Sequence, residues 1–511
     1  MIIAALALTG LMQFQAAPAN DFQMTTALQQ IAGTSNYARY VNYAPRINMR
    51  SPVSGSVLIA QAIRAGKLRI PYAIRPQVSP DNLNCSPVPC TTPNVQASNG
   101  GSPANETPIT VDPNNSMHLL SGANDYNCSA VEGFYASSNG GSTWNHTCMN
   151  VLSGASGDGD PGVGYDTNHV AYITAIDAIG SGSVIAFEKS TNNGTTWSAP
   201  AQAVVGISPW TFVDKPWTQI DDTPTSPGKD DIYISTTEFD PSSNSIIAVG
   251  HSTDHGSTWH NVKVDSAVYP VVDQFSDLAI GKDGTVYVTW MRCSATGPTG
   301  DCGGTTSMIM FAKSTNGGVS WSAPVLIAKA PLAPDSCGAF YGCLPNTSER
   351  VSNVPAVDVD RSSGNFANRL YTIMYKWNGT RLIVYVSHSG SGGSSWSTPV
   401  RVAPGAPNDE FFPWLTTSST GTVGATWLDR RLDPSNINYD AFASTSANGG
   451  VSFAAGARLS TVSSNPFNDG FGSGFMGDYT GDIWRGNTLF GSWTDTRSGT
   501  TGQDEIGGLK I

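Results

Sequence analysis

The sequence predicts an all-β protein made of many short antiparallel strands, and three observations support this prediction. The first is the composition, since 54 glycines and 32 prolines with only 13% charged residues among 511 are typical of strands joined by turns. The second is a short polar turn closed by a tryptophan, "SNGGSTW" in its first copy, which recurs along the chain. The third is the alternating apolar pattern before each copy, as in "VIAFEKS" and "MIMFAKS".

The repeated turn has a fixed pattern: Ser, any residue, Asn or Asp, any residue, Gly, any residue, Thr or Ser, then an aromatic residue. Asn or Asp bonds its own backbone two residues on, and Gly adopts a positive φ, so each residue type has a physical reason. A repeat whose aromatic residues lie 53 to 75 residues apart predicts a β-propeller of antiparallel blades. The copies begin at Ser137, Ser190, Ser252, Ser314 and Ser446, with a looser copy at Ser389.

We expect seven blades, because a seventh unit follows the sixth turn in "FMGDYTGDIW", "NTLFGSWTDTR" and "EIGGLKI"; six blades is the alternative. The seventh unit ends before its fourth strand, so we expect closure by a strand from the N-terminal side, at Ala73–Ser79 ("AIRPQVS"). The chain then divides into a candidate signal segment (1–19), a lead-in that is partly helical or poorly ordered (20–72), and one propeller domain (73–511). The convincing helical stretch of the lead-in is "SVLIAQAIRAGK".

The cysteines and the charge indicate where the protein works. The eight cysteines form sequence-near couples, which predicts four local disulfides and an oxidising compartment, so we expect a secreted or periplasmic protein. Residues 2–12 resemble the apolar part of a secretory signal, although the basic segment before it is missing. A net charge of −12 disfavours nucleic acid and anionic membranes. The couples are Cys85 with Cys90, Cys128 with Cys148, Cys293 with Cys302, and Cys337 with Cys343.

In its repeated turn the chain resembles the Asp-box, or BNR-repeat, proteins, whose best-known members are the sialidases. The resemblance covers residues 100–511 and includes signatures found in exported sialidase-like proteins of this group. It implies four-stranded blades in which the turn, the Asp-box, joins the third strand to the fourth. The signatures are "NET" at Asn105–Thr107, "DKPW" at Asp214–Trp217, "WLDRRLDP" at Trp427–Pro434 and "GDY" at Gly477–Tyr479.

With the Asp-boxes at one end of the blades, the loops after second strands and before first strands meet at the other end. These loops are rich in carboxylates, arginines and aromatic residues, a combination that suits a saccharide. Sialidases use three arginines on the substrate carboxylate, an Asp acid/base and a late Tyr nucleophile assisted by Glu. Here no arginine occurs from Pro76 to Met291, so a clamp must use later arginines, and we cannot place a base beside Tyr479.

We therefore expect a sialidase-like glycoside hydrolase acting on extracellular glycans. The alternatives are a non-catalytic propeller that binds glycan or protein, and a polysaccharide lyase in which a Tyr or Lys abstracts a proton. The Asp–Arg pairs could instead link blades, and the tryptophans could be packing residues. The candidate catalytic residues are Asp429, Asp478, Tyr479 and Asp495, and the candidate substrate-binding residues are Arg292, Arg350, Arg430, Arg431, Arg497, Trp217 and Trp414.

We assign no cofactor and no metal ligand. Calcium is the ion left open, because "GDGDP" and "GDYTGD" offer carboxylate oxygens, although turn chemistry explains both stretches as well. The expected partner is a glycan or polysaccharide, without nucleic acid or membrane insertion, and we expect a monomer.

Overall fold

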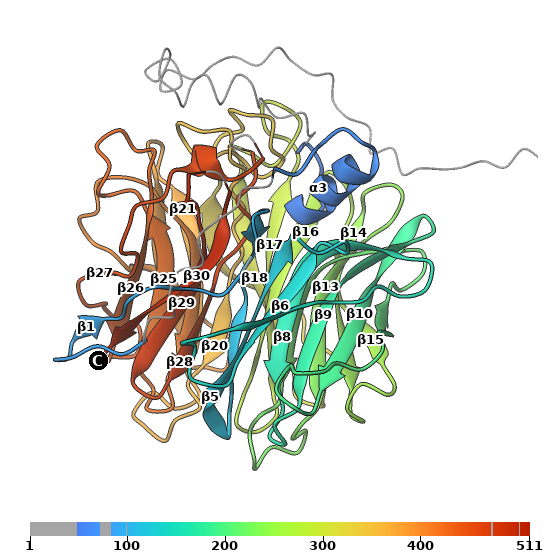
Figure 1. The fold of residues 1–511 in the computed structure, drawn as a ribbon, viewed down its shortest axis with the longest axis horizontal. Coiled ribbons are helices and arrows are strands. Elements are labelled where there is room, and N and C mark those ends of the chain that lie inside the picture. The colour runs from blue at the N-terminus through green and yellow to red at the C-terminus, as the bar shows by residue number, and fades with distance from the viewer. Residues whose placement is uncertain (1–48, 72–82, 99, 472–473, 500) are drawn as a thin grey trace, which may run out of the picture.

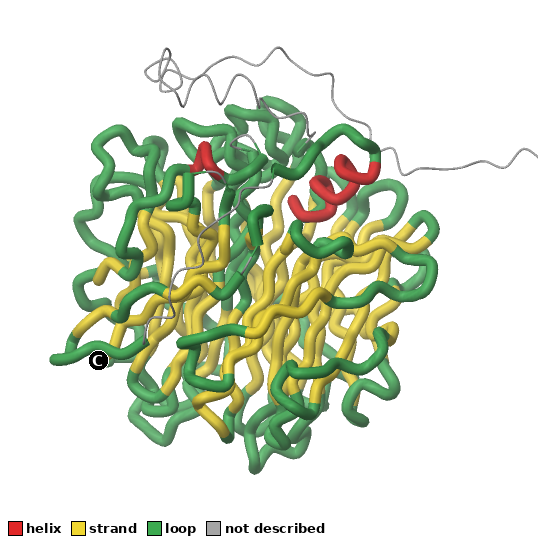
Figure 2. The backbone as a smooth tube through the Cα atoms, in the orientation of Figure 1, coloured by secondary structure: helices red, strands yellow, loops and turns green. Residues whose placement is uncertain are grey.

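The described part of the chain forms a ring of seven antiparallel sheets (Figures 1 and 2). The computed structural model describes residues 49–71, 83–98, 100–471, 474–499 and 501–511. The first strand of each sheet contacts the first strands of its two neighbours, and the last sheet contacts the first, so the ring is closed. The protein is a seven-bladed β-propeller, and the prediction of seven blades is confirmed.

The strands of the first four blades are, in blade 1, β3 (Ala104–Asn105), β4 (Ile109–Asp112), β5 (Asn115–Asp125), β6 (Glu132–Ser137) and β7 (Asn145–Cys148); in blade 2, β8 (Ser156–Tyr165), β9 (Ala171–Ile179), β10 (Gly182–Ser190) and β11 (Ala201–Val205); in blade 3, β12 (Phe212–Ile220), β13 (Ile232–Phe239), β14 (Ser245–Ser252) and β15 (His260–Ala267); and in blade 4, β16 (Val271–Ile280), β17 (Val286–Ser294), β18 (Thr306–Ser314) and β19 (Val325–Pro331). The remaining strands are, in blade 5, β20 (Val357–Val359), β21 (Leu370–Trp377), β22 (Leu382–Ser389) and β23 (Val400–Arg401); in blade 6, β24 (Glu410–Thr417), β25 (Val423–Asp429), β26 (Asp440–Ser446) and β27 (Ala457–Arg458); and in blade 7, β28 (Gly481–Arg485), β29 (Thr488–Asp495) and β30 (Gln503–Lys510) with β1 (Cys90–Thr91) and β2 (Val95–Gln96).

The ring closes by joining the two ends of the described chain in blade 7. β1 and β2, from the N-terminal side, pair antiparallel with β30, the last strand. Residues 90–96 therefore supply the outer strand that this blade lacks. The strand expected at Ala73–Ser79 lies outside the described residues.

The repeated turn joins the third and fourth strands of blades 1 to 6 and forms the same hydrogen bonds in successive copies. In the first copy, Ser137 Oγ accepts the Gly141 N–H (2.8 Å), and Asn139 Oδ1 accepts the Thr143 N–H (2.9 Å). The closing aromatic residue packs between blades, as Trp396 of blade 5 does against Phe311 of blade 4. The turn is thus both a local hydrogen-bonded unit and an inter-blade contact.

A segment before the propeller covers one mouth of its central channel. We call residues 49–71 the lead-in; it contains α3 (Gly55–Arg64), the helix expected from "SVLIAQAIRAGK". Figures 1 and 2 show α3 at the same end of the blades as the short helix η1 (Pro466–Asn468). One face of α3 is buried against the blades, including Val57 and Ile59, while Gln61 is exposed. The remainder of the predicted lead-in and the candidate signal segment lie outside the described residues.

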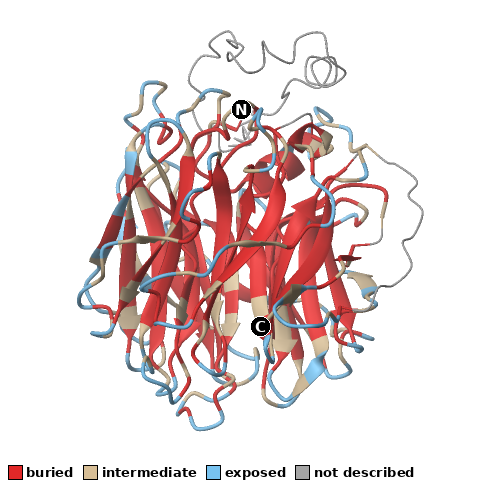
Figure 3. Ribbon diagram, turned by 90° about the vertical axis from the view of Figure 1, so that its left-hand side faces the viewer, coloured by how far each residue is buried: buried red, intermediate tan, exposed pale blue. Residues whose placement is uncertain are grey.

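All four predicted disulfides are present: Cys85–Cys90, Cys128–Cys148, Cys293–Cys302 and Cys337–Cys343. Figure 3 shows that the strands are buried along most of their length, while exposed residues gather in the connections. Among the described residues, no helix is long and apolar enough to cross a membrane.

Candidate active site

The first strands of the blades share a bulge near the mouth that α3 covers. At this level of blades 1, 2, 3, 4 and 6, a residue other than glycine adopts a left-handed backbone conformation. In blades 2, 3, 4 and 6, the pairing between the first and second strands also shifts register there. Such a conformation costs roughly 1–2 kcal/mol and is typical of functional sites. The residues are Glu106 (φ 59°), Asp160 (57°), Lys215 (49°), Phe275 (61°) and Phe412 (45°).

Two carboxyls from blades 1 and 2 meet at this bulge. Glu106 and Asp160 are fully buried and become hydrogen-bond partners when one of them holds a proton. Burial, and then the charge of Asp160, raise the pKa of Glu106 well above its usual value. Glu106 also accepts the Asn124 amide (2.9 Å), whereas neither oxygen of Asp160 has another partner among the described residues. The pair therefore combines a carboxyl whose pKa is raised with a second carboxyl whose oxygens have no partner outside the pair among the described residues.

An aromatic layer lies below the carboxyl pair. The rings of Trp217 and Trp414 are 4.4 Å apart between centroids, and Tyr479 lies 5.7 Å from Trp217 and 6.2 Å from Trp414. Lys215 Nζ lies 3.8 Å from the centre of the Tyr479 ring, and it has no hydrogen-bond partner among the described residues. Burial lowers the pKa of Lys215, opposed by the surrounding carboxylates. Aromatic faces with a cation and acids beside them can hold a polar ring and an anionic group.

Tyr479 is surrounded by acids that come from other blades. Its hydroxyl donates to the Pro161 carbonyl (3.3 Å). Burial, followed by the charges of Glu106 and Asp160, raises the pKa of Tyr479 well above its usual value. Two carboxyls of blades 1 and 2 therefore lie close enough to Tyr479 for their charges to act on its hydroxyl.

Two further carboxylates hold the N-terminal end of α3. Asp478 is paired through Oδ1 with Arg350 Nε (2.9 Å), both side chains being fully buried, and its Oδ2 accepts the Gly55 N–H (2.8 Å). Asp214 Oδ2 accepts the Ser54 N–H (2.8 Å), and burial raises the pKa of Asp214 to about 7. A helix N-terminus favours negative charge, so this end of α3 complements the acidic site.

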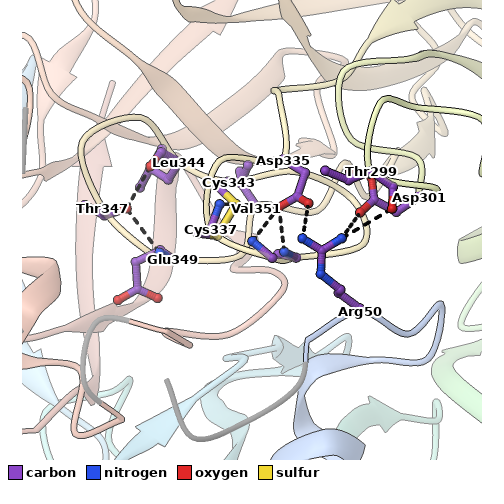
Figure 4. Close-up of a disulfide and its surroundings, with 12 residues drawn as sticks. Arg50, Thr299, Asp301, Asp335, Cys337, Cys343, Leu344, Thr347, Glu349 and Val351 are labelled. Carbon is purple, nitrogen blue, oxygen red and sulfur yellow. Dashed lines mark hydrogen bonds and ion pairs between the residues drawn. A yellow bond between two sulfur atoms is a disulfide. The ribbon is translucent and has the colours of Figure 1, made fainter. Parts of the chain in front are cut away.

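The lead-in is also anchored at both of its described ends. Arg50 forms ion pairs with Asp301 (3.1 Å) and Asp335 (3.0 Å), next to the Cys337–Cys343 disulfide (Figure 4). Arg64, at the end of α3, pairs with Asp158. With the lead-in in place, the carboxyl pair, Lys215 and Tyr479 are all buried.

On the other side of the aromatic layer, the channel contains a cavity of about 460 Å³ lined by first strands of all seven blades. Its carboxyls already have partners: Asp277 accepts the Val357 N–H (2.6 Å), and Asp482 accepts the Thr416 hydroxyl (2.7 Å). Burial raises the pKa of Asp277 to about 8 and that of Asp482 to about 7. These groups link neighbouring blades.

Of the predicted site residues, five come together at the covered mouth, whereas Asp429 and Asp495 do not. Asp429 accepts Trp427 Nε1 (2.7 Å) and pairs with Arg431 (2.5 Å). Asp495 makes the same contacts with Trp493 (3.0 Å) and Arg497 (2.7 Å). Each set is local to its blade. The five that meet are Asp478, Tyr479, Arg350, Trp217 and Trp414.

The arginines predicted to form a clamp on the substrate are each paired with a carboxylate of this chain. Arg292 pairs with Asp273 (2.6 Å) and Asp265 (2.7 Å). Arg430 is buried 3.5 Å from Asp409, and burial lowers its pKa to about 10. Like Arg350, Arg431 and Arg497, both already have carboxylate partners, because a guanidinium taken out of water needs one. The two stretches considered for calcium contain Asp158 and Asp478, whose carboxylates pair with arginines.

Glu106, Asp160 and Lys215 lie in the stretches "NET", "GDGDP" and "DKPW", but none of the three is among the site residues predicted from the sequence. A signal was present: Asp160, Lys215 and Phe412 each stand directly before a proline at the same level of a first strand. The recurrence of an unusual backbone at one level of the ring marks these side chains, and it becomes visible only when the blades are aligned.

The sequence matches no family model and no curated protein. Solved structures that it resembles include the Hadza microbial sialidase Hz136, at 16% identity and a TM-score of 0.42 over 64% of this chain and 63% of that chain. The chain therefore matches less than two thirds of that sialidase's length. Others are the α-L-arabinofuranosidase Arb93A from Fusarium graminearum (12%, 0.44, 68% and 92%) and an α-L-arabinanase from Penicillium chrysogenum (11%, 0.44, 68% and 92%). Similarity at this level says nothing about the chemistry of this chain.

Proposed function

We propose that this protein is an exported, sialidase-like glycoside hydrolase of the Asp-box group, and that its active site is the covered mouth of the channel. The observation that supports this most is the meeting of Glu106 and Asp160 with the aromatic layer that contains Tyr479. A carboxyl whose pKa is raised by burial and by a neighbouring acid can serve as general acid, and aromatic walls can receive a sugar ring. The four disulfides support export.

In this proposal each residue has a distinct role. Tyr479 attacks the anomeric carbon, which is the recognised exception to the use of two carboxylates in glycoside hydrolysis. Asp160, whose oxygens have no partner outside the pair among the described residues, takes the phenol proton, and Glu106 gives a proton to the leaving oxygen. Lys215, the cation without a hydrogen-bond partner, binds an anionic group of the sugar, while Arg350 keeps Asp478 in place.

The proposal requires that the lead-in leaves the mouth before a glycan enters. A substitution at Gly55 provides a way to test this, since a Cβ there would lie 2.0 Å from Cε2 of the Phe475 ring. Gly55→Leu should therefore unseat α3 while leaving the blades intact. Gln61→Leu adds the same side chain on the exposed face of α3 and is the matched control.

The experiment compares wild type, Gly55→Leu and Gln61→Leu for release from a fluorogenic sialoside and for retention on a mixed glycan array. Trypsin cleavage after Arg64 or Lys67 reports whether the lead-in has been unseated. We expect release from Gly55→Leu alone, and its loss when Tyr479→Phe or Asp160→Asn is added. An unseated lead-in with neither release nor retention would refute the proposal.

Two observations favour other functions, and the same experiment distinguishes them. Every predicted clamp arginine already has a carboxylate partner, so none is set aside for a substrate carboxylate. This favours a non-catalytic glycan-binding propeller, which retention without release would identify. The lowered pKa of Lys215 suits a base, which favours a polysaccharide lyase acting next to a uronate carboxylate. Products that absorb in the ultraviolet would identify the lyase.

A further inference from the structure

At the Asp-box end of the propeller, far from the covered mouth, two histidines meet one carboxylate. Asp112 ends β4, His118 lies in β5, and His169 lies in the turn between β8 and β9 of the next blade. His118 Nδ1 is 3.2 Å and His169 Nδ1 is 2.7 Å from the same oxygen, Asp112 Oδ2. One potential ligand atom from each of the three residues lies within 4.8 Å of those of the other two. Two ring nitrogens and a carboxylate oxygen therefore face one small volume.

The surroundings fix this arrangement. The other oxygen of Asp112 accepts the N–H groups of Asn114 (2.9 Å) and Asn115 (3.1 Å), and the Asp112 side chain is fully buried. The Asn114 amide donates to the Thr167 carbonyl (2.7 Å), which joins the turn of blade 1 to the turn of blade 2. The Asn115 amide lies 3.0 Å from His118 Nε2 and can orient the ring from behind. The carboxylate and both turns are thus positioned by contacts other than those to the histidines.

We propose that Asp112, His118 and His169 form a zinc site that links blades 1 and 2. Imidazole nitrogen with one carboxylate suits Zn²⁺, whereas Ca²⁺ and Mg²⁺ require mostly oxygen ligands. Tetrahedral zinc with bonds of about 2.0–2.1 Å separates its ligand atoms by roughly 3.3 Å. The distance from His118 Nδ1 to Asp112 Oδ2, 3.2 Å, is close to this value, and the distance from His169 Nδ1, 2.7 Å, is about half an ångström shorter.

The other candidate metal-binding clusters lack free ligand atoms. Among the described residues, two further groups could hold a metal by position, but both rely on cysteines, Cys128 with Cys148 and Cys337 with Cys343. These cysteines are bound in disulfides and have no thiolate to offer. The Asp112 site remains, with three protein ligands, of which His169 is half-exposed. That composition is typical of a zinc ion that keeps an exchangeable water.

The experiment measures Zn²⁺ binding to the tag-free, EDTA-treated full chain by calorimetry, with Co²⁺ absorption as a report on coordination geometry. Wild type is compared with His118→Ala, His169→Ala and the control His255→Ala. His255 matches His169 closely: it has a left-handed backbone (φ 56° against 67°), a half-exposed side chain and one aspartate partner, but no second histidine.

We expect one equivalent of Zn²⁺ to bind to wild type and His255→Ala, with a Co²⁺ spectrum of tetrahedral type and a rise in the unfolding temperature. His118→Ala and His169→Ala should each weaken binding at least about tenfold while remaining folded by circular dichroism. The proposal would be overturned if Zn²⁺ showed no saturable binding at concentrations up to about 1 mM. Binding that survives both substitutions would overturn it as well. Because the site is independent of the covered mouth, the result does not depend on the proposed hydrolase activity.

Discussion

Replacing Arg350 with methionine should destabilise the protein more than replacing any exposed arginine. Arg350 and Asp478 form an ion pair (2.9 Å) in which both side chains are fully buried. Methionine can still pack against Tyr341 and Phe275, whose rings the guanidinium now covers, so the main loss is the charge. Removing one partner of a buried pair leaves the other charge uncompensated and typically costs about 3–5 kcal/mol. We therefore expect Arg350→Met to lower the free energy of unfolding by about 4 kcal/mol.

The measurement is urea unfolding of wild type, Arg350→Met, Asp478→Asn and the double variant, with disulfides intact. In the double variant no charge is stranded, so its cost should be lower than the sum of the single costs by at least about 2 kcal/mol. Arg458→Met is the control, because Arg458 is 37% exposed in its pair with Asp440 and should cost about 1 kcal/mol or less. Equal costs for Arg350→Met and Arg458→Met, or additive single costs, would show that the pair is not energetically important.

Two more predictions concern the stability of the blades. Asp277, with a pKa raised to about 8, and Asp482, with a pKa raised to about 7, stay protonated in the folded protein at pH values where the unfolded chain has ionised them. The stability that these two carboxyls contribute is thus fully present below about pH 4 and is lost as the pH rises through 7 to 8. Thermal unfolding should therefore occur at a lower temperature at pH 8 than at pH 5. An equal or higher unfolding temperature at pH 8 would contradict this reasoning. Gly393→Ala should cost about 3 kcal/mol in urea unfolding, because φ is +84° and the new Cβ would lie 2.0 Å from the Phe311 ring. Gly390→Ala in the same turn meets nothing within 4 Å and should change stability by less than about 0.5 kcal/mol; similar costs for both would show that the turn is not held against blade 4.

The propeller could be predicted from the sequence because its signals are local. The Ser137 and Asn139 side chains bond N–H groups four residues on, so the turn is encoded within one short stretch. The alternation of apolar residues in the flanking strands has the same short range. The disulfides were predictable for a related reason, since their cysteines are separated by 5 to 20 residues.

The candidate site was only partly predictable. Tyr479 and Asp478 were selected from a short signature, but their partners come from blades 1 and 2, and Glu106 is 372 residues from Asp478. The arginine clamp was predicted from residue type alone. Residue type does not reveal that Arg431 lies against Asp429 or that Arg497 lies against Asp495, two positions earlier in each case.

The sequence by itself determined the number of blades, the position of the turn in each blade, the disulfides and the helix of the lead-in. Each of these depends on residues close together in the chain, where backbone preferences and hydrogen bonds act directly. The tertiary structure decided which charged groups meet, that α3 covers them, and that His118 and His169 share Asp112. Those contacts join segments from different blades, and only the closure of the ring sets their distances.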